Sequence, residues 1–289
     1  MDNGSKTRAS SCYHLAPRIS MLGKKQMPRY NPSNSLHNPE KLFFAVLTGG
    51  RTASHWLTQM LSAHPKIFAL QNGRNQLKRH LGKAMGITEY YDLLDHLGTS
   101  FDMAGDVHGV SLAETSHLKN KYGSNFRYAF MTRDPITRIT SMKYMYPQEG
   151  FQRGLDMVNH VAQGTPLEMW DRVRYVNGTW LVGEAPIYKM EEITSEWSAV
   201  DSLLRYLAHN YSEGVNEAVS LAETVGGAFN KQRSSLRPGT NKFGSDRKIY
   251  SAEEDFEKWT GDERLYFRRH LNPSARRAYE LMGYDLSFV

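Results

Sequence analysis

The segment from Lys41 to Pro65 places the tightest limit on the fold. Six apolar residues, 42–47, form a run of strand length and end at Thr48-Gly49-Gly50, after which apolar side chains repeat at helical spacing. This order predicts a strand, a tight loop and a helix. In such a loop the backbone N–H groups and the positive end of the helix dipole are directed at the space above the strand. They make it an anion site, with phosphate as the expected ligand.

Strand, loop and helix alternate again further along the chain. Further strands are predicted at residues 67–70, 103–110 and 126–131, and helices at 77–97, 112–121 and after Pro135. Such alternation is typical of a parallel sheet flanked by helices, whose ligands bind at the carboxyl ends of the strands. We therefore predict an α/β fold with a central parallel sheet in a single domain.

Composition limits the remaining classes. The 289 residues are 40% hydrophobic, enough for a large core, and the net charge of +6 suits an acidic ligand. Cys12 is the only cysteine, so we expect no disulfide framework, no cysteine-based metal site and a cytoplasmic location. No run approaches the ~20 apolar residues of a membrane span. Residues 1–38 are polar and basic and are expected to form a mobile leader before a domain at 39–289.

A second segment carries chemistry, at residues 132–141. Arg133 stands at the mouth of the predicted helix, next to Asp134-Pro135, and Ser141 follows eight residues after Arg133. Proline is accepted in the first turn of a helix because its missing N–H has no partner to lose there. Taken alone, Arg133 would be a surface ion-pair residue and Ser141 a residue of a polar helix face.

Together the two segments resemble the sulfotransferases that use 3′-phosphoadenosine 5′-phosphosulfate (PAPS). Residues 50–57 are similar to that family's 5′-phosphosulfate loop, and residues 132–141 are similar to its 3′-phosphate motif, in which an Arg, an Asn/Asp-Pro pair and a Ser eight positions after the Arg recur. Weaker similarity extends to residues 186–193, 236–239 and 281–285. The resemblance implies a P-loop-like phosphosulfate-binding loop, PAPS as co-substrate and no metal.

The resemblance also implies roles for individual residues. Arg51 would face the bridging oxygen on which charge grows as the sulfuryl group leaves. Trp56 would lie near the adenine. The implied contacts to the 5′-phosphosulfate are Arg51, Thr52, Ala53, Ser54 and His55, and those to the 3′-phosphate are Arg133, Ser141, Arg237 and Gly239.

An alcohol acceptor also needs a general base. His108 is our first choice because it ends a predicted strand on the ligand side and small-molecule members of the family place a catalytic histidine after a comparable strand. Glycan-directed members often use a glutamate soon after the second strand, but this chain has Gln71 and Asn72 there, which cannot act as bases. Asp106 and Glu114 are the reserve candidates.

The phosphosulfate loop departs from the family pattern at two positions. Ala53 stands where glycine is usual, and His55 stands where threonine or serine is usual. If position 53 needs a positive φ, its methyl group carries a conformational cost. His55 can still donate a hydrogen bond to phosphate.

Other function classes stay open. A P-loop kinase would need Gly-x-x-x-x-Gly-Lys-Ser/Thr, which this loop lacks, and an acidic Mg²⁺ ligand, for which Asp106 is the one candidate. A non-catalytic module could bind nucleotides or polyanions through the leader with Lys24-Lys25, and through Arg268-Arg269 and Arg276-Arg277, but no nucleic-acid motif accompanies them. The acceptor, small molecule or glycan, is not predicted; residues 145–180 and 195–230, expected to be helical, would shape its site.

Overall fold

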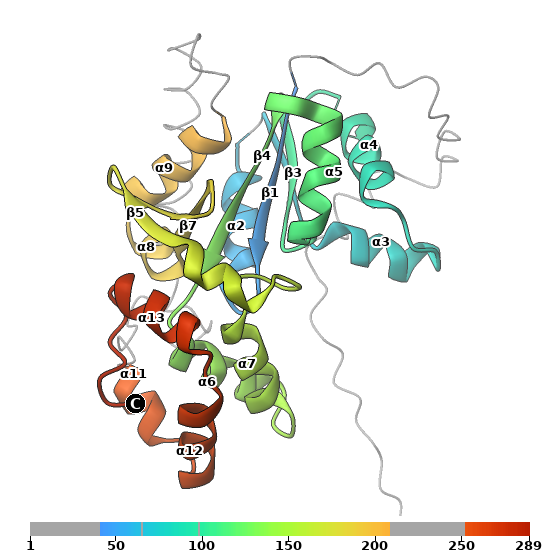
Figure 1. Ribbon diagram of the computed structural model, residues 1–289. Helices are drawn as coiled ribbons and strands as arrows, with labels where there is room; N and C mark the ends of the chain where they lie inside the picture. The colour runs from blue at the N-terminus through green and yellow to red at the C-terminus, as the bar shows by residue number, and fades with distance from the viewer. Residues whose placement is uncertain (1–40, 65, 98, 209–251) are drawn as a thin grey trace, which may run out of the picture. The chain divides into compact units, whose positions relative to one another are not determined.

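A seven-stranded sheet organises the computed structural model (Figure 1), which describes residues 41–64, 66–97, 99–208 and 252–289. The strand order is β2-β3-β1-β4-β7-β6-β5. Strands β2, β3, β1, β4 and β7 pair in parallel, and β6 and β5 add an antiparallel extension at one edge. The strands are β1 Leu42–Thr48, β2 Ile67–Gln71, β3 Met103–Val107, β4 Phe126–Thr132, β5 Val173–Val176, β6 Thr179–Val182 and β7 Ala185–Lys189.

Helices connect the parallel strands and pack on both faces of the sheet (Figure 1). The helices near the strands are α2 Ser54–Leu61, α3 Gly73–Leu81, α4 Ile87–Leu97, α5 Leu112–Tyr122, α6 Pro135–Met145, α7 Gly150–Asn159, α8 Met190–Ser195 and α9 Trp197–Leu207. The C-terminal part forms α11 Ala252–Glu257, α12 Gly261–His270 and α13 Pro273–Leu281. The predicted α/β architecture with strand, loop and helix at its centre is confirmed.

The alternation of side chains along β1 divides the core in two. Phe43, Ala45 and Leu47 face a cluster that includes residues of α4, α5, α6, α7 and the C-terminal helices. Phe44 and Val46 face the opposite cluster, with residues of α2 and α9. Every residue of β1 is buried, as expected for a central parallel strand covered on both faces. The carboxyl end of this strand is therefore a rigid base for the loop that follows.

Three expectations about the elements were wrong in detail. The predicted helix at 77–97 is two helices, because the chain breaks near Gly82, where φ is +69°. The strand predicted to reach residue 110 ends at Val107, because His108 has a φ of +78° that no strand can accommodate. Residues 145–180, expected to be helical, contain α7 but also the β5–β6 hairpin.

Several predictions fall on residues that the structure does not describe. These are the leader at 1–38, the first two residues of the predicted domain, residues 209–230 of the second acceptor-shaping stretch, and the weak motif carrying Arg237 and Gly239. The predicted helical character of the other part of that stretch is confirmed by α9.

Candidate functional site

The loop between β1 and α2 has an unusual backbone. Gly50, Arg51 and Ala53 all have positive φ, at 83°, 57° and 55°. Ala53 is the N-cap of α2 in the left-handed region, which is the condition under which its methyl group costs conformational energy. Left-handed non-glycine residues gather at ligand-binding sites because the surrounding fold holds them there. The loop is thus a strained turn at the N-terminus of a helix.

The start of α6 supplies the second half of the site. Asp134 caps this helix by accepting the N–H of Thr137 at 2.7 Å, and Pro135 takes the first helical position. The side chain of Arg133 folds back along the first turn, with Nε donating to Thr137 Oγ1 at 3.1 Å. One end of Arg133 is thereby fixed, and its Nη1 reaches the neighbouring loop.

The two sequence segments meet through Arg51. Its Nε and Nη2 donate to Ser141 Oγ at 3.0 and 2.9 Å, and Arg133 Nη1 donates to the carbonyl oxygen of Arg51 at 3.2 Å. Burial lowers the pKa of Arg51 from its usual value, although Tyr146 works in the opposite direction. The residues assigned to two different phosphates are therefore neighbours, joined by hydrogen bonds across the loop.

The helix side of the loop is braced by amide side chains. His55 Nδ1 lies 3.1 Å from Gln71 Oε1, and its Nε2 lies 2.9 Å from Gln59 Nε2. Gln71 Nε2 donates to Ser54 Oγ at 2.9 Å. Gln71, excluded from acting as a base, thus orients two of the predicted phosphate ligands.

Thr52 and Trp56 point inward. Thr52 is fully buried, and its Oγ1 has no hydrogen-bond partner within the described residues. Trp56 is only 7% exposed and belongs to the core cluster on the α2 face of the sheet. Its proposed place near an adenine stays a prediction, and Arg237 and Gly239 lie outside the described residues.

His108 stands beside the loop. Its Nδ1 lies 2.6 Å from Thr48 Oγ1 and 3.2 Å from the Thr48 carbonyl oxygen. A Cβ placed on Gly50 would be 3.7 Å from Cε1 of the ring. Burial lowers the pKa of His108, with the Thr48 contact opposing and the charge of Arg138 assisting. A neutral imidazole with Nδ1 held by Thr48 leaves Nε2 as its proton acceptor.

Asp106 is structural rather than available for chemistry. It is fully buried, accepts the N–H groups of Asn72 and Gly73 at 3.0 and 2.8 Å, and accepts the hydroxyl of Tyr90 at 2.5 Å. Burial raises its pKa to about 6, against the lowering effect of these hydrogen bonds. A carboxylate enclosed in this way can neither take an acceptor's proton nor bind Mg²⁺ without breaking the start of α3.

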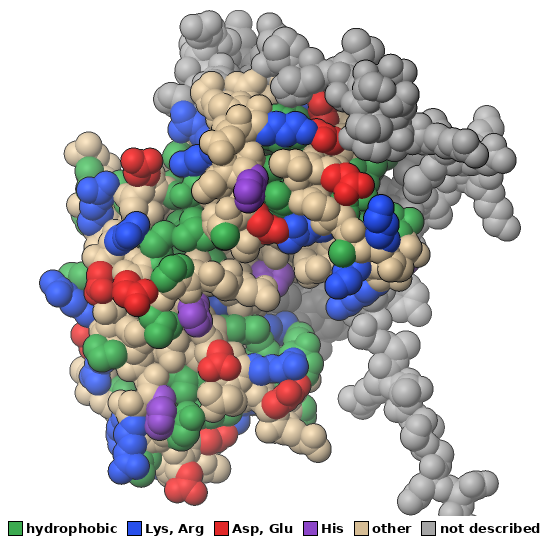
Figure 2. All heavy atoms as spheres, turned by 45° about the vertical axis from the view of Figure 1, so that its right-hand side comes forward, with side chains coloured by type: hydrophobic (Ala, Val, Ile, Leu, Met, Phe, Trp, Pro, Cys, Tyr) green, Lys and Arg blue, Asp and Glu red, His purple; other side chains and the backbone are tan. Residues whose placement is uncertain are grey.

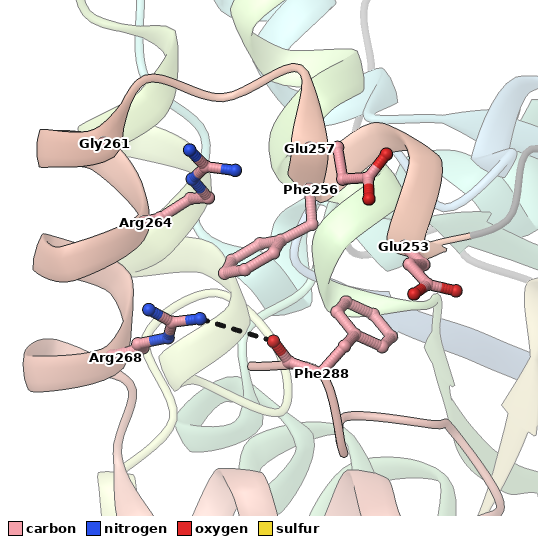
Figure 3. A pocket seen from close by; sticks show the side chains of 7 residues that line it. All are labelled: Glu253, Phe256, Glu257, Gly261, Arg264, Arg268 and Phe288. Carbon is pink, nitrogen blue, oxygen red and sulfur yellow. Dashed lines mark hydrogen bonds between the residues drawn. The ribbon is translucent and has the colours of Figure 1, made fainter.

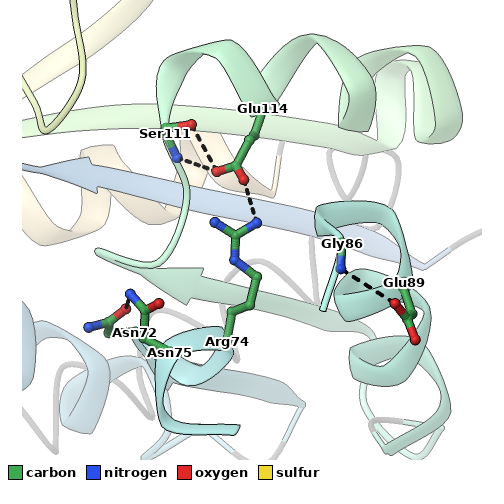
Figure 4. Close-up of polar contacts among 7 residues, drawn as sticks. All are labelled: Asn72, Arg74, Asn75, Gly86, Glu89, Ser111 and Glu114. Atoms are coloured by element: carbon green, nitrogen blue, oxygen red, sulfur yellow. Dashed lines mark hydrogen bonds and ion pairs between the residues drawn. The ribbon is translucent and has the colours of Figure 1, made fainter. Parts of the chain in front are cut away.

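Glu114 is also engaged (Figure 4). It closes the capping box of α5 with Ser111, and it forms an ion pair with Arg74 of α3. Burial raises the pKa of Glu114, but the hydrogen bonds from Arg74 and Ser111 outweigh that effect and hold the pKa below its usual value. Glu114 therefore links α3 to α5.

Sequence analysis missed two residues of this region. Thr48 holds His108, but a threonine at the end of a strand carries no distinguishing signal. Arg138 is fully buried, and its Nε donates to the Gly50 carbonyl oxygen at 3.0 Å. An arginine one turn into a helix is usually exposed, so only the packing of α6 under the loop reveals its position.

Other surfaces hold none of the predicted site residues. A pocket of about 420 Å³ lies between α11, α12 and the C-terminal segment (Figure 3), lined by Glu253, Phe256, Glu257, Gly261, Arg264, Arg268 and Phe288. The face in Figure 2 intersperses basic and acidic side chains rather than gathering a basic patch. In the described part of the chain, no His, Cys, Asp or Glu cluster could hold a metal, and no helix is long and apolar enough to cross a membrane.

Arg268 and Arg276, from the two basic pairs, already have partners. Arg268 lies over the ring of Phe256 at 5.4 Å, and Arg276 pairs with Glu280 at 3.0 Å. These contacts do not favour a polyanion groove on α12 and α13.

The fold is that of an α/β protein, with a positive-φ loop at the carboxyl end of a central parallel strand. Its fold is similar to two solved sulfotransferase domains. The domain from the Curacin Biosynthetic Pathway is 11% identical, with a TM-score of 0.40, over 85% of this chain and 98% of that one. The domain from the Synechococcus PCC 7002 Olefin Synthase is 14% identical, with a TM-score of 0.39, over 90% of this chain and 98% of that one.

No family model matches the chain, and no curated protein matches it. Similarity at these scores does not identify an activity, which has to follow from the residues of the site.

Proposed function

We propose that this chain is a sulfotransferase that moves a sulfuryl group from PAPS to a hydroxyl or amine of a small-molecule or glycan acceptor. One contact carries this assignment. Arg51 of the first segment bonds Ser141 of the second, 90 residues away, so both predicted phosphate motifs belong to one site. A ligand with two separated anionic groups suits such a site better than one with a single phosphate.

The residues present fit such a ligand. Arg51 and Arg138 form no ion pair with a carboxylate of the described chain, although both are at least half-buried. The buried hydroxyl of Thr52 has no hydrogen-bond partner among the residues that the structure describes. Uncompensated positive charge and an unpartnered donor at a helix N-terminus are the features that an incoming anion would satisfy.

The chain's residues would divide the work as follows. The loop N–H groups and Arg51 would hold the 5′-phosphosulfate, and Arg51 would stabilise the charge that grows on the bridging oxygen. Arg133 would bind the 3′-phosphate. His108 Nε2 would accept the proton of an acceptor hydroxyl as its oxygen bonds the sulfur and the sulfur–oxygen bond to the 5′-phosphate breaks. A cytoplasmic location stays a prediction from the cysteine count.

Calorimetric titration with 3′-phosphoadenosine 5′-phosphate (PAP), against ATP with Mg²⁺ as the rival, tests the donor site. We expect tight, magnesium-independent binding of PAP. Arg133→Ala should weaken PAP binding by about 10- to 100-fold, the value of a charge-assisted hydrogen bond, and should weaken adenosine 5′-phosphate binding far less. The matched control is Arg174→Ala, an exposed arginine on β5. Preference for ATP, or binding of neither nucleotide, would contradict the proposal.

A second candidate is a non-catalytic anion-binding module. The specific observation in its favour is the left-handed Ala53. Glycine is usual at this position in the sulfotransferases that the chain resembles, and a chain that only binds an anion could tolerate the added methyl group. Tight PAP binding without sulfuryl transfer across a panel of alcohols, amines and glycans would favour it.

A further inference from the structure

Arg138 is a buried cation that the proposed chemistry does not use directly. Its side chain is fully buried in α6, and neither Nη1 nor Nη2 makes a hydrogen bond of normal geometry within the described residues. The hydroxyl of Tyr279 opposes the lowering of the Arg138 pKa by burial, but this hydroxyl is neutral and donates its own hydrogen to the Val158 carbonyl oxygen at 3.3 Å. No carboxylate of the described residues forms an ion pair with Arg138. Glu191, a more distant negative charge, already accepts the Asp134 N–H and the Tyr284 hydroxyl. Burying such a guanidinium is costly, so an apolar side chain would serve packing alone better.

The guanidinium lies directly under the loop. Arg138 Nε donates to the Gly50 carbonyl oxygen at 3.0 Å. A Cβ added to Gly49 would lie 1.9 Å from Nη2 and 3.1 Å from Cζ. Any side chain at position 49 would therefore displace the guanidinium. Each of the two adjacent positions needs glycine for a different reason. Gly50 adopts a φ of +83°, and Gly49 leaves room for the side chain of Arg138.

Two successive carbonyl groups of the loop point toward arginines of the second segment. Arg138 donates a hydrogen bond to the carbonyl oxygen of Gly50, and Arg133 donates one to the carbonyl oxygen of Arg51. No peptide bond here is cis, and in a trans peptide the N–H is antiparallel to the C=O. The N–H groups of Arg51 and Thr52 therefore face the opposite side of the loop. Neither donates to an acceptor within the described residues.

We propose that Arg138 is a positioning residue, which holds the peptide between Gly50 and Arg51 so that the Arg51 N–H faces the anion. This inference rests on the proposed anion role of the loop. Arg138 does not touch the ligand, because it is buried beneath the loop backbone. It acts through its hydrogen bond to the Gly50 carbonyl oxygen. Its positive charge also polarises that peptide and so strengthens the Arg51 N–H as a donor to the anion. The 5′-phosphosulfate end of a ligand should depend on Arg138, and the 3′-phosphate end should not.

Binding of PAP, adenosine 5′-phosphate and adenosine 3′-phosphate to Arg138→Met tests this directly. Met keeps most of the side-chain volume and removes the donor. We expect the affinity for PAP and adenosine 5′-phosphate to fall by about tenfold or more and that for adenosine 3′-phosphate to change less than threefold. Arg138→Lys, which can still donate one hydrogen bond to the Gly50 carbonyl, should recover part of the loss. Arg127→Met, on β4, is the matched control.

A second variant covers the case in which Arg138→Met does not fold. Gly49→Ala keeps Arg138 in the sequence, but the added methyl group should push its guanidinium away from the loop. The variant should therefore reproduce the selective loss of affinity for 5′-phosphate ligands. Gly86→Ala is its control, because a Cβ there meets open space. Unchanged 5′-phosphate affinity in both the Met and the Ala variants, or equal losses for 3′- and 5′-phosphates, would overturn the positioning role.

Inorganic sulfate separates this inference from the proposed function. If the unaltered protein fails to bind PAP but is thermally stabilised by sulfate, the sulfotransferase proposal fails, and the positioning role is judged by whether Arg138→Met abolishes the sulfate effect. Retained stabilisation by sulfate in Arg138→Met would contradict it. An unaltered protein that binds neither PAP nor sulfate would overturn both.

Discussion

Two contacts with Thr48 fix the ring of His108, the proposed general base. A base at Nε2 requires the proton to sit on Nδ1, where the carbonyl and hydroxyl oxygens of Thr48 can accept it. Burial lowers the pKa of His108, which keeps the ring neutral at pH 7. Its position next to Gly50 places it at the loop between β1 and α2 rather than in the general core.

Substitution of His108 therefore has a specific expected outcome. With a hydroxyl acceptor, turnover should be flat above pH 7 and fall only below the usual histidine pKa of about 6.5, because the ring is then protonated. His108→Ala should lower turnover by about 10²- to 10⁴-fold and leave PAP affinity unchanged. Thr48→Val should give a smaller loss. The measurement is a pH profile of kcat beside a PAP titration; full turnover in His108→Ala would assign the proton to another group.

At the scale of elements, the shape of the loop between β1 and α2 requires backbone conformations that are strained for residues with a Cβ. Three of its residues lie at positive φ, and only Gly50 among them lacks a Cβ. Arg133, just before α6, and Arg138, within it, donate hydrogen bonds to carbonyl groups of the same loop. A chain folds into such a turn only if the flanking strand and helix are themselves firmly packed, as the fully buried β1 is here.

Ala53→Gly measures that strain. A left-handed alanine costs roughly 1–2 kcal/mol, and glycine adds about 0.4–1 kcal/mol of unfolded-state entropy, so we expect a net gain of up to about 1.6 kcal/mol in unfolding free energy. PAP affinity should not decrease. Ala113→Gly in α5 is the control, where the same change should destabilise. Denaturant titration gives both values, and a less stable Ala53→Gly protein would rule out strain at this turn.

For the whole molecule, the sequence predicts the elements better than their contacts. Apolar runs and helical periods locate β1, α2, β4 and α6 because each buries a regular set of apolar side chains. The β5–β6 hairpin escapes prediction because Arg174, Tyr175 and Val176 are exposed and give no apolar period. Arg138 and Gln71 escape because their roles come from packing between segments far apart in the chain. Local pattern can locate the loop between β1 and α2 but cannot say which side chains pack against it.

Asp134 links the site to the stability of the whole protein. Burial raises its pKa to about 7, with Glu191 assisting and the Thr137 N–H and Arg133 opposing. The unfolded chain should titrate near the ordinary value of 3.8. The folded state thus binds the proton more tightly, and the contribution of this group is present at low pH and lost as pH rises from about 4 to about 7.

Asp134→Asn removes that titration but can still cap α6, because an amide oxygen accepts the Thr137 N–H equally well. The unaltered protein should lose up to about 1.4 kcal/mol of unfolding free energy per pH unit over that interval, and the variant should not. The stability of the variant relative to the unaltered protein should therefore be highest at pH 8. Asp106 contributes a slope of the same sign to both proteins and cancels. Denaturant unfolding at pH 5, 6, 7 and 8 measures the difference, with Asp156→Asn on the exposed side of α7 as the control. A pH-independent difference between the two proteins would show that Asp134 is ionised throughout, and that the charges of Arg133 and the loop outweigh its burial.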